Sequence, residues 1–231
     1  MTTTLITGAN KGLGFQAARR LIAAGHTVYL GARDEQRGKQ AASELGGRLV
    51  LIDVTSDDSV GAAAALIHEE VGHLDVLVNN AGISGGRKRP GDVTAADMRA
   101  VYDTNVFGVV RVMHAFLPLL QASSAPIVVN VSSGMGSLAV TTDARRFEST
   151  LLGLAYPSSK TALNMLTSQY AKAFPAIKIN AVDPGYTATD LNAHRGTQTV
   201  EQGAEIIVRM ATVAADGPTG GYFDADGPVP W

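Results

Sequence analysis

The chain has 231 residues, of which 45% are hydrophobic and 17% are charged, and its formal net charge at pH 7 is −2. This length supports a well-buried core without disulfides or metals, and the balanced charge does not favour nucleic acid as a partner. Because the chain has no cysteine, thiol catalysis, disulfides and cysteine-ligated metals are excluded.

Short apolar runs alternate with amphipathic segments along the chain. The apolar runs predict strands over 3–9, 27–32, 48–54, 74–80, 126–133 and 177–184, with an edge strand over 220–227. Helices are predicted over 12–24, 36–45, 57–71, 95–121, 156–174 and 199–212. Runs such as VLVNN (76–80) are typical of strands covered on both faces. We therefore predict an α/β fold, a single doubly wound, Rossmann-type domain over residues 1–231 with a mostly parallel seven-stranded sheet and helices on both faces.

Three irregular segments, 83–94, 134–155 and 185–198, each follow the carboxyl end of a predicted strand. Open α/β sheets bind ligands at that edge, so we expect 185–198 to form a short lid over a substrate and 134–155 to form an insert. The N-terminal sequence lacks a secretion-signal pattern, and no apolar run reaches the ~18 residues of a membrane helix. We therefore expect a cytoplasmic protein without a membrane partner.

The first predicted strand leads into the glycine-rich turn TGANKGLG, residues 7–14. Such a strand-to-helix turn directs backbone N–H groups toward a phosphate, and glycine lets a pyrophosphate approach closely. The spacing of Gly8, Gly12 and Gly14 is common in ordinary turns, but its place between a strand and an amphipathic helix favours a dinucleotide site.

The second predicted strand ends where dinucleotide-binding proteins select their cofactor. An acidic residue there binds the ribose hydroxyls of NAD, whereas this chain has Ala32 followed by Arg33, and Lys11 lies in the glycine turn. A guanidinium and an ammonium suit a 2′-phosphate, so NADP(H) is favoured over NAD(H). Two alternatives stay open. In the first, Lys11 and Arg33 are solvated surface charges and Asp34 caps the next helix. In the second, Asp34 binds the ribose, which would favour NAD(H) over NADP(H).

Tyr156 and Lys160 stand four residues apart in AYPSSKTALN, one turn apart on a predicted helix that begins near Pro157. Two ordinary side chains of an amphipathic helix would show the same spacing. Whether this pair is catalytic depends on the other motifs of the chain. They occur in the order TGANKGLG (7–14), DVT (53–55), NNAG (79–82), YDTNVFG (102–108), NVSS (130–133), YPSSK (156–160) and PGYTAT (184–189).

With these motifs nearly the whole chain resembles the classical short-chain dehydrogenase/reductase superfamily, and its glycine-turn lysine and ARD (32–34) are most similar to the NADPH-dependent carbonyl-reductase branch. The resemblance implies reduction of a small-molecule carbonyl substrate, a ketone, aldehyde or quinone. Tyr156 would donate the proton, and Lys160 would favour the phenolate and hold the nicotinamide ribose. Ser133 would polarise the substrate oxygen, with Ser132 on the opposite side of the strand as the alternative. Asn105 would hold a water of the proton relay.

The resemblance also implies a cofactor site along the same edge of the sheet, and no metal site. Its residues would be Gly8, Asn10, Lys11, Gly12, Leu13, Gly14, Arg33, Asp53, Val54, Asn80, Ala81, Gly82, Tyr156, Lys160, Pro184, Gly185, Thr187 and Thr189.

The segment TTDARRFESTLLGL (141–154) separates Ser133 from Tyr156 farther than in compact members of the superfamily. We expect the leucines of this segment, Leu151, Leu152 and Leu154, to cover apolar surface. We expect its charged residues Arg145, Arg146 and Glu148 to face water. We also expect the insert to line the substrate entrance, which leaves the two long helices free to form a homodimer rather than a monomer or tetramer.

A rival function is a non-catalytic NADP(H)-binding protein that responds to the redox state. Such relatives usually lack the tyrosine or the lysine. Because Asn105, Ser133, Tyr156 and Lys160 are all present, the sequence favours an enzyme.

Overall fold

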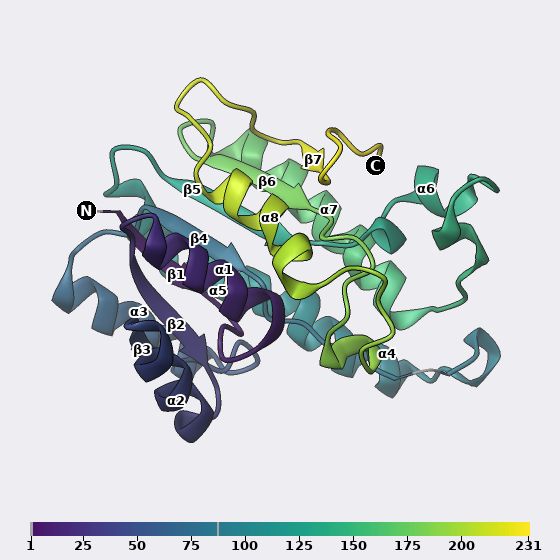
Figure 1. Cartoon of the computed structure of the whole chain (residues 1–231), viewed down its shortest axis with the longest axis horizontal. Coiled ribbons are helices and arrows are strands. Elements are labelled where there is room, and N and C mark those ends of the chain that lie inside the picture. Colours follow the sequence, from purple (N-terminus) through teal and green to yellow (C-terminus); the bar gives the residue numbers. More distant parts are fainter. Residues whose placement is uncertain (1, 87) are drawn as a thin grey trace.

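The computed structural model describes residues 2–86 and 88–231. Its seven strands form one sheet in the order β3-β2-β1-β4-β5-β6-β7, in which every pair of neighbours is parallel (Figure 1). The strands are β1 (Thr3–Ile6), β2 (Thr27–Ala32), β3 (Arg48–Leu51), β4 (Val76–Asn79), β5 (Ile127–Val131), β6 (Lys178–Val182) and β7 (Tyr222–Phe223). The predicted α/β fold is confirmed, and the strand order reverses between β1 and β4, where such sheets bind ligands.

Helices cover both faces of the sheet. The core on one face joins the strands to α3, α5 and α7, and the core on the other joins them to α1, α2 and α8. Alternation along β1 supplies both cores, because Leu5 packs in the first and Ile6 in the second. The helices are α1 (Gly12–Ala23), α2 (Glu35–Leu45), α3 (Asp57–Glu70), α4 (Ala95–Tyr102), α5 (Gly108–Gln121), α6 (Leu138–Thr142), α7 (Ala155–Ala173) and α8 (Val200–Ala211).

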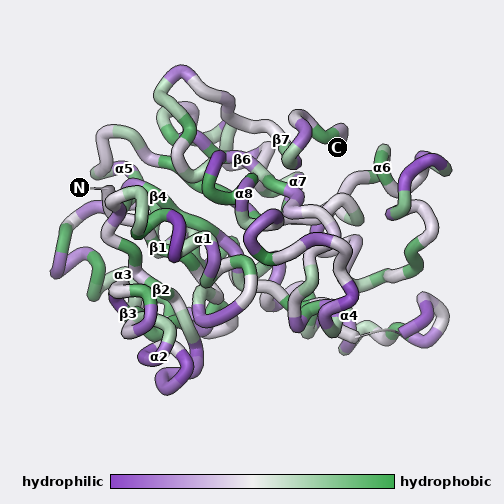
Figure 2. Tube along the Cα trace, viewed as in Figure 1, coloured by the Kyte–Doolittle hydropathy of each residue, from purple (hydrophilic) through white to green (hydrophobic). Residues whose placement is uncertain are grey.

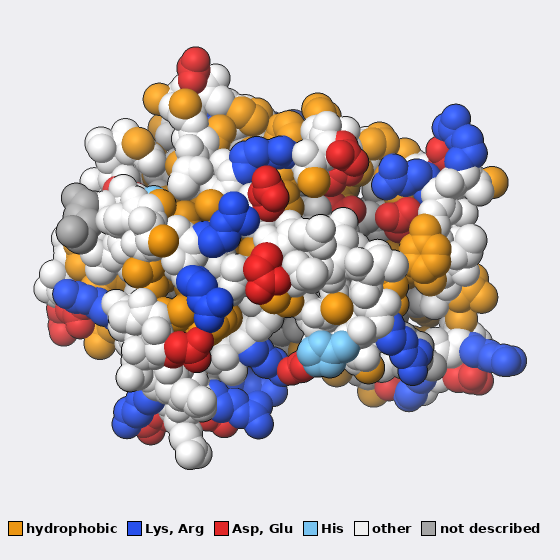
Figure 3. Space-filling view, viewed as in Figure 1, with side chains coloured by type: hydrophobic (Ala, Val, Ile, Leu, Met, Phe, Trp, Pro, Cys, Tyr) orange, Lys and Arg blue, Asp and Glu red, His pale blue; other side chains and the backbone are white. Residues whose placement is uncertain are grey.

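The hydropathy of the chain follows this layering. Figure 2 shows hydrophobic residues along β1 and β4, whereas α2 at the edge is hydrophilic over much of its length. Figure 3 shows Lys and Arg side chains interspersed with Asp and Glu over one face of the molecule. Within the described ranges, no helix is both long and apolar enough to cross a membrane.

The strands predicted over 48–54 and 220–227 are shorter in the structure, as β3 (Arg48–Leu51) and β7 (Tyr222–Phe223), and two further differences lie near the candidate site. The helix predicted over 95–121 is interrupted by a π-helical turn, Asp103–Phe107, which separates α4 from α5. The strand predicted over 3–9 ends at Ile6, because the following residues leave the sheet to form the glycine turn. Of the irregular segment 83–94, residue 87 lies outside the described residues. Both differences fall at the edge of the sheet where the candidate site lies.

Candidate active site

The glycine turn leads from β1 into α1 and is shaped by two left-handed residues, Gly8 with φ of 65° and Gly12 with φ of 58°. A Cβ atom on Gly14 would overlap the Asn80 side chain and lie 2.7 Å from the Gly8 carbonyl oxygen. Lys11, the residue before α1, makes no side-chain hydrogen bond to the helix. The first N–H groups of α1 therefore lack this cap and suit a phosphate group.

The segment after β4 is tied to the glycine turn by hydrogen bonds. The Asn80 side-chain nitrogen donates to the carbonyl oxygens of Thr7 at 2.9 Å and of Gly8 at 3.0 Å. The Thr7 hydroxyl accepts from the backbone N–H groups of Asn80 and Ala81, at 3.0 and 3.1 Å. These bonds hold together the two segments that flank the reversal of strand order, so they fix the floor of the candidate cofactor site.

The residues expected to select the cofactor lie at the same edge. Lys11 Nζ is 2.6 Å from Asp190 Oδ2 in the lid, and both side chains are more than half exposed. Arg33 is exposed. Asp34 stands at the N-cap of α2, where its carboxylate accepts from the Arg37 N–H at 2.9 Å. Of the two alternatives for Asp34, the structure shows the helix cap.

Asp53 and Val54 follow β3 beside these cations. The Asp53 carboxylate accepts from the N–H and hydroxyl of Thr55, at 2.9 and 2.7 Å, and these bonds lower the pKa of Asp53. Arg33 and Arg111 act on that carboxylate in the same direction. Asp53 is therefore a fixed anion at the site edge.

The two serines after β5 point to different environments, as strand alternation predicts. The Ser132 hydroxyl is buried and donates to Asn164 Oδ1 at 2.6 Å. The Ser133 side chain accepts from the Met135 N–H at 3.3 Å, and its hydroxyl is close enough to the phenol of Tyr156, the second residue of α7, to act on the pKa of that phenol. The structure therefore brings Ser133 to the Tyr156 phenol, whereas the Ser132 hydroxyl is bonded to Asn164.

Lys160 lies one turn along α7 and is only 4% exposed. Its Nζ donates to the Val131 carbonyl oxygen at 2.7 Å and lies 5.7 Å from the centre of the Tyr156 ring. Burial lowers the pKa of Lys160 to about 8, against the opposing effect of Asp183. Burial raises the pKa of Tyr156 to about 12, although the Ser133 hydroxyl acts in the other direction. The expected depression of the Tyr156 pKa is therefore absent from this structure, because burial outweighs the favourable contacts.

Asn105 lies in the π-helical turn between α4 and α5 and bonds across the site rather than within its own helix. Its side chain accepts from the Ile83 N–H and donates to the Ile83 carbonyl oxygen, both at 2.9 Å. It also donates to the Ser159 hydroxyl at 3.0 Å, and Ser159 in turn donates to the Tyr156 carbonyl oxygen at 2.7 Å. A Cβ atom on Gly82 would lie 3.4 Å from the Asn105 oxygen and 3.7 Å from Lys160 Nζ. The Asn105 amide and the Lys160 ammonium therefore border the same space. π-Helical turns such as the one that holds Asn105 are frequently found at functional sites.

The lid begins with PGYTAT and reaches back over the glycine turn. The buried Thr187 hydroxyl donates to the Pro184 carbonyl oxygen at 3.1 Å. Gly185 has a φ of 73°, and the Thr189 methyl would lie 3.8 Å from a Cβ atom on Gly12. The lid residues expected at the nicotinamide therefore share one edge with the turn expected at the phosphates.

Two carboxylates beside the turn that follows Ser133 were not expected. Asp183 is buried at the end of β6, and burial raises its pKa, with nearby Glu148 acting in the same direction. A Cβ atom on Gly134 would lie 2.8 Å from Asp183 Oδ2 and 2.9 Å from Glu148 Oε1. The expectation that Glu148 faces water is therefore wrong, because the short turn Phe147–Thr150 folds back onto the segment after Ser133.

The leucines of the insert also depart from expectation. Leu152 is 84% exposed, and Leu154 is exposed as well. Leu152 therefore covers no apolar surface. The position of Asp183 at the carboxyl end of the strand predicted over 177–184 was a signal for a site residue, whereas nothing in the local pattern around Glu148 indicated its inward direction.

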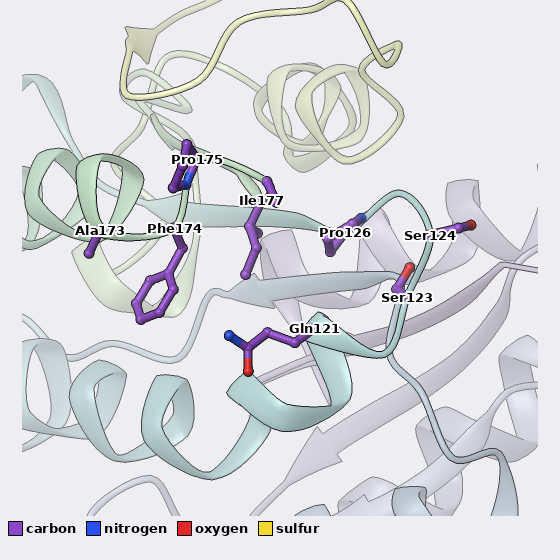
Figure 4. Close-up of a pocket in the computed structure, with 9 residues that line it drawn as sticks. Gln121, Ser123, Ser124, Pro126, Ala173, Phe174, Pro175 and Ile177 are labelled. Carbon is purple, nitrogen blue, oxygen red and sulfur yellow. The ribbon is translucent and has the colours of Figure 1, made fainter.

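Figure 4 shows a pocket at the opposite end of the sheet, where β5 and β6 begin. It has a volume of about 350 Å³, and Phe174 and Ile177 point toward Gln121 at the end of α5. Its lining contains no titratable side chain. This pocket therefore lies apart from the residues described above.

The short chain dehydrogenase family model matches residues 2–200. The chain belongs to the short chain dehydrogenase family. It is 34% identical to (-)-isopiperitenone reductase from Mentha piperita, over 96% of each chain. The NADPH-bound carbonyl reductase from chicken fatty liver superposes with a TM-score of 0.89 at 27% identity, over 100% of this chain and 99% of that chain. Salutaridine reductase from Papaver somniferum superposes with a TM-score of 0.84 at 29% identity, over 97% of this chain and 100% of that chain. The chain is therefore an oxidoreductase of a family that uses a nicotinamide cofactor.

Proposed function

We propose that this short chain dehydrogenase reduces a ketone, aldehyde or quinone to an alcohol with NADPH, and that Tyr156 donates the proton. One observation carries the proposal: the Ser133 hydroxyl is close enough to the Tyr156 phenol to act on its pKa, and the Nζ of buried Lys160, one turn along α7, lies 5.7 Å from the centre of the Tyr156 ring. The similarity to reductases, including a carbonyl reductase with NADPH bound, supports it.

Four side chains share the work: two act on the substrate, and two act on the phenol of Tyr156. The Ser133 hydroxyl would donate to the carbonyl oxygen and polarise it, and the Tyr156 phenol would then protonate that oxygen. Bound NADPH supplies the hydride that the carbonyl carbon accepts. A phenol with a pKa of about 12 carries its proton at neutral pH, so Tyr156 is ready to act as the acid. Lys160 would stabilise the phenolate that remains, and a water held by Asn105 would return a proton to it.

The cofactor residues have separate tasks in this proposal. The glycine turn and the start of α1 would hold the pyrophosphate, and Lys11 and Arg33 would hold the 2′-phosphate. Asp53 and Val54 would flank the adenine. The remaining residues, Asn10, Leu13, Asn80, Ala81, Gly82, Pro184, Gly185, Thr187 and Thr189, would line the rest of the cofactor site. Asp34 supports this choice of cofactor, since its carboxylate already caps α2.

The proposal is tested by following NADPH absorbance with purified protein and a panel of ketones, aldehydes and quinones. Carbonyl-dependent loss of NADPH supports the enzyme. NADPH binding without turnover of any carbonyl in the panel would instead support the rival function, a redox-responsive binding protein.

A further inference from the structure

The insert is anchored beside the catalytic serine at two places. In its middle, Glu148 approaches Gly134, the residue after Ser133, as described above. At its end, a Cβ atom on Gly153 would lie 3.2 Å from the Pro157 ring in the first turn of α7, and 3.9 Å from the Met135 methyl. The insert is therefore folded against both segments that carry the catalytic hydroxyls.

The insert also contacts the lid. The ring centres of Phe147 and Tyr186 are 5.6 Å apart and the rings are tilted by 41°. The carbonyl oxygen of Tyr186 accepts from the N–H groups of Thr197 and Gln198, at 2.8 and 3.0 Å, which closes the lid on itself. Because β5 and β6 are neighbours, the segments that leave their carboxyl ends are joined through these rings.

The aromatic pair is incompletely covered. Phe147 remains 54% exposed although it packs on Tyr186. Hydrophobic side chains are visible on the right of Figure 3, on the side where Figure 1 places α6. Phe147, next to Glu148 in the chain, thus offers a flat and partly exposed apolar surface near the segment that follows Ser133, and ring pairs favour offset or edge contacts.

We propose that Phe147, together with Tyr186, is a specificity-determining residue that binds a flat apolar ring of the substrate while its carbonyl group reaches Ser133 and Tyr156. The inference rests on the proposed carbonyl reduction and names its substrate class, carbonyl compounds that carry such a ring. Phe147 contacts the remote part of the substrate, so it acts on binding and leaves the chemical step unchanged.

The test compares two methyl ketones, benzylacetone and butanone, which differ by a phenyl ring. Phe147→Ala should raise KM for benzylacetone about three- to tenfold, the scale of one aromatic contact. Its kcat, its KM for butanone and its Kd for NADPH should stay at the parent values, and Phe147→Tyr should restore the low KM for benzylacetone. Leu152→Ala is the matched control, since it removes another exposed apolar side chain of the same insert, and it should change neither KM.

Equal changes in KM for the two ketones, or no change for benzylacetone, would overturn this inference and leave the proposed function standing. Failure of the parent protein to reduce any carbonyl compound in the panel would overturn the proposed function, and this inference with it.

Discussion

Replacing Lys11 and Arg33 together by alanine should weaken NADPH binding far more than NADH binding. A charge-assisted contact contributes about 1.5–3 kcal/mol, so two contacts to a 2′-phosphate contribute about 3–6 kcal/mol. Lys11 already pairs with Asp190 at 2.6 Å, and a phosphate would share its ammonium with that carboxylate. We therefore expect the lower end, about 3 kcal/mol, or roughly a 10²-fold rise in the Kd of NADPH.

The effect on folding should be small, because exposed ion pairs contribute only about 0–1 kcal/mol to stability. Fluorescence titration with NADPH and NADH measures both affinities, and thermal unfolding checks the fold. Asp190→Asn is the matched control: it removes the competing carboxylate, keeps Lys11, and should tighten NADPH binding a few-fold, on the scale of an exposed pair. A double variant that discriminates between the two cofactors as the parent does would refute the assignment of Lys11 and Arg33.

Three further predictions address the catalytic residues and the glycine turn. Because the pKa of Lys160 is lowered to about 8, its charge is present below that pH and lost above it; kcat/KM for reduction should fall above about pH 8, and Lys160→Arg should move the fall upward. A fall in kcat/KM at the same pH in the parent and in Lys160→Arg would contradict the assignment of this pH dependence to Lys160. Ser133→Ala should cost about 10²-fold in kcat, whereas Ser132→Ala should keep turnover and lose about 1–3 kcal/mol in urea unfolding, since it leaves a buried partner unpaired; the reverse pattern would exchange their roles. Gly14→Ala should destabilise the fold by about 1–3 kcal/mol through overlap with its neighbours, whereas Gly61→Ala, at a helix position with open space around it, should raise the melting temperature. Equal effects of the two alanines would contradict the close packing of the turn.

Much of the fold could be predicted from the sequence because its signals are local. Alternation places Leu5 and Ile6 on opposite faces of a strand, and almost continuous apolar runs show that both faces are covered. The order of the motifs also located Tyr156 and Ser133, and the structure brings the two hydroxyls close enough for Ser133 to act on the pKa of Tyr156. Their catalytic roles stay predictions.

Contacts between distant segments could not be predicted in this way. The approach of Glu148 to Asp183 and the pairing of Lys11 with Asp190 join residues far apart in the chain, and no periodicity records them. The π-helical turn around Asn105 was also missed, because the apolar spacing of a helix continues on both sides of it. These three features lie at the carboxyl edge of the sheet, where bonding to neighbouring segments overrides local preference.

The central claim is that Tyr156 protonates a carbonyl oxygen during reduction by NADPH. The most direct measurement compares kcat of the parent and Tyr156→Phe with the best carbonyl substrate of the panel, after titration has shown that both bind NADPH equally. Phenylalanine keeps the ring and removes only the hydroxyl near Ser133. We predict a loss of at least ~10²-fold in kcat, the scale of a removed acid–base group. Turnover close to that of the parent would contradict the mechanism.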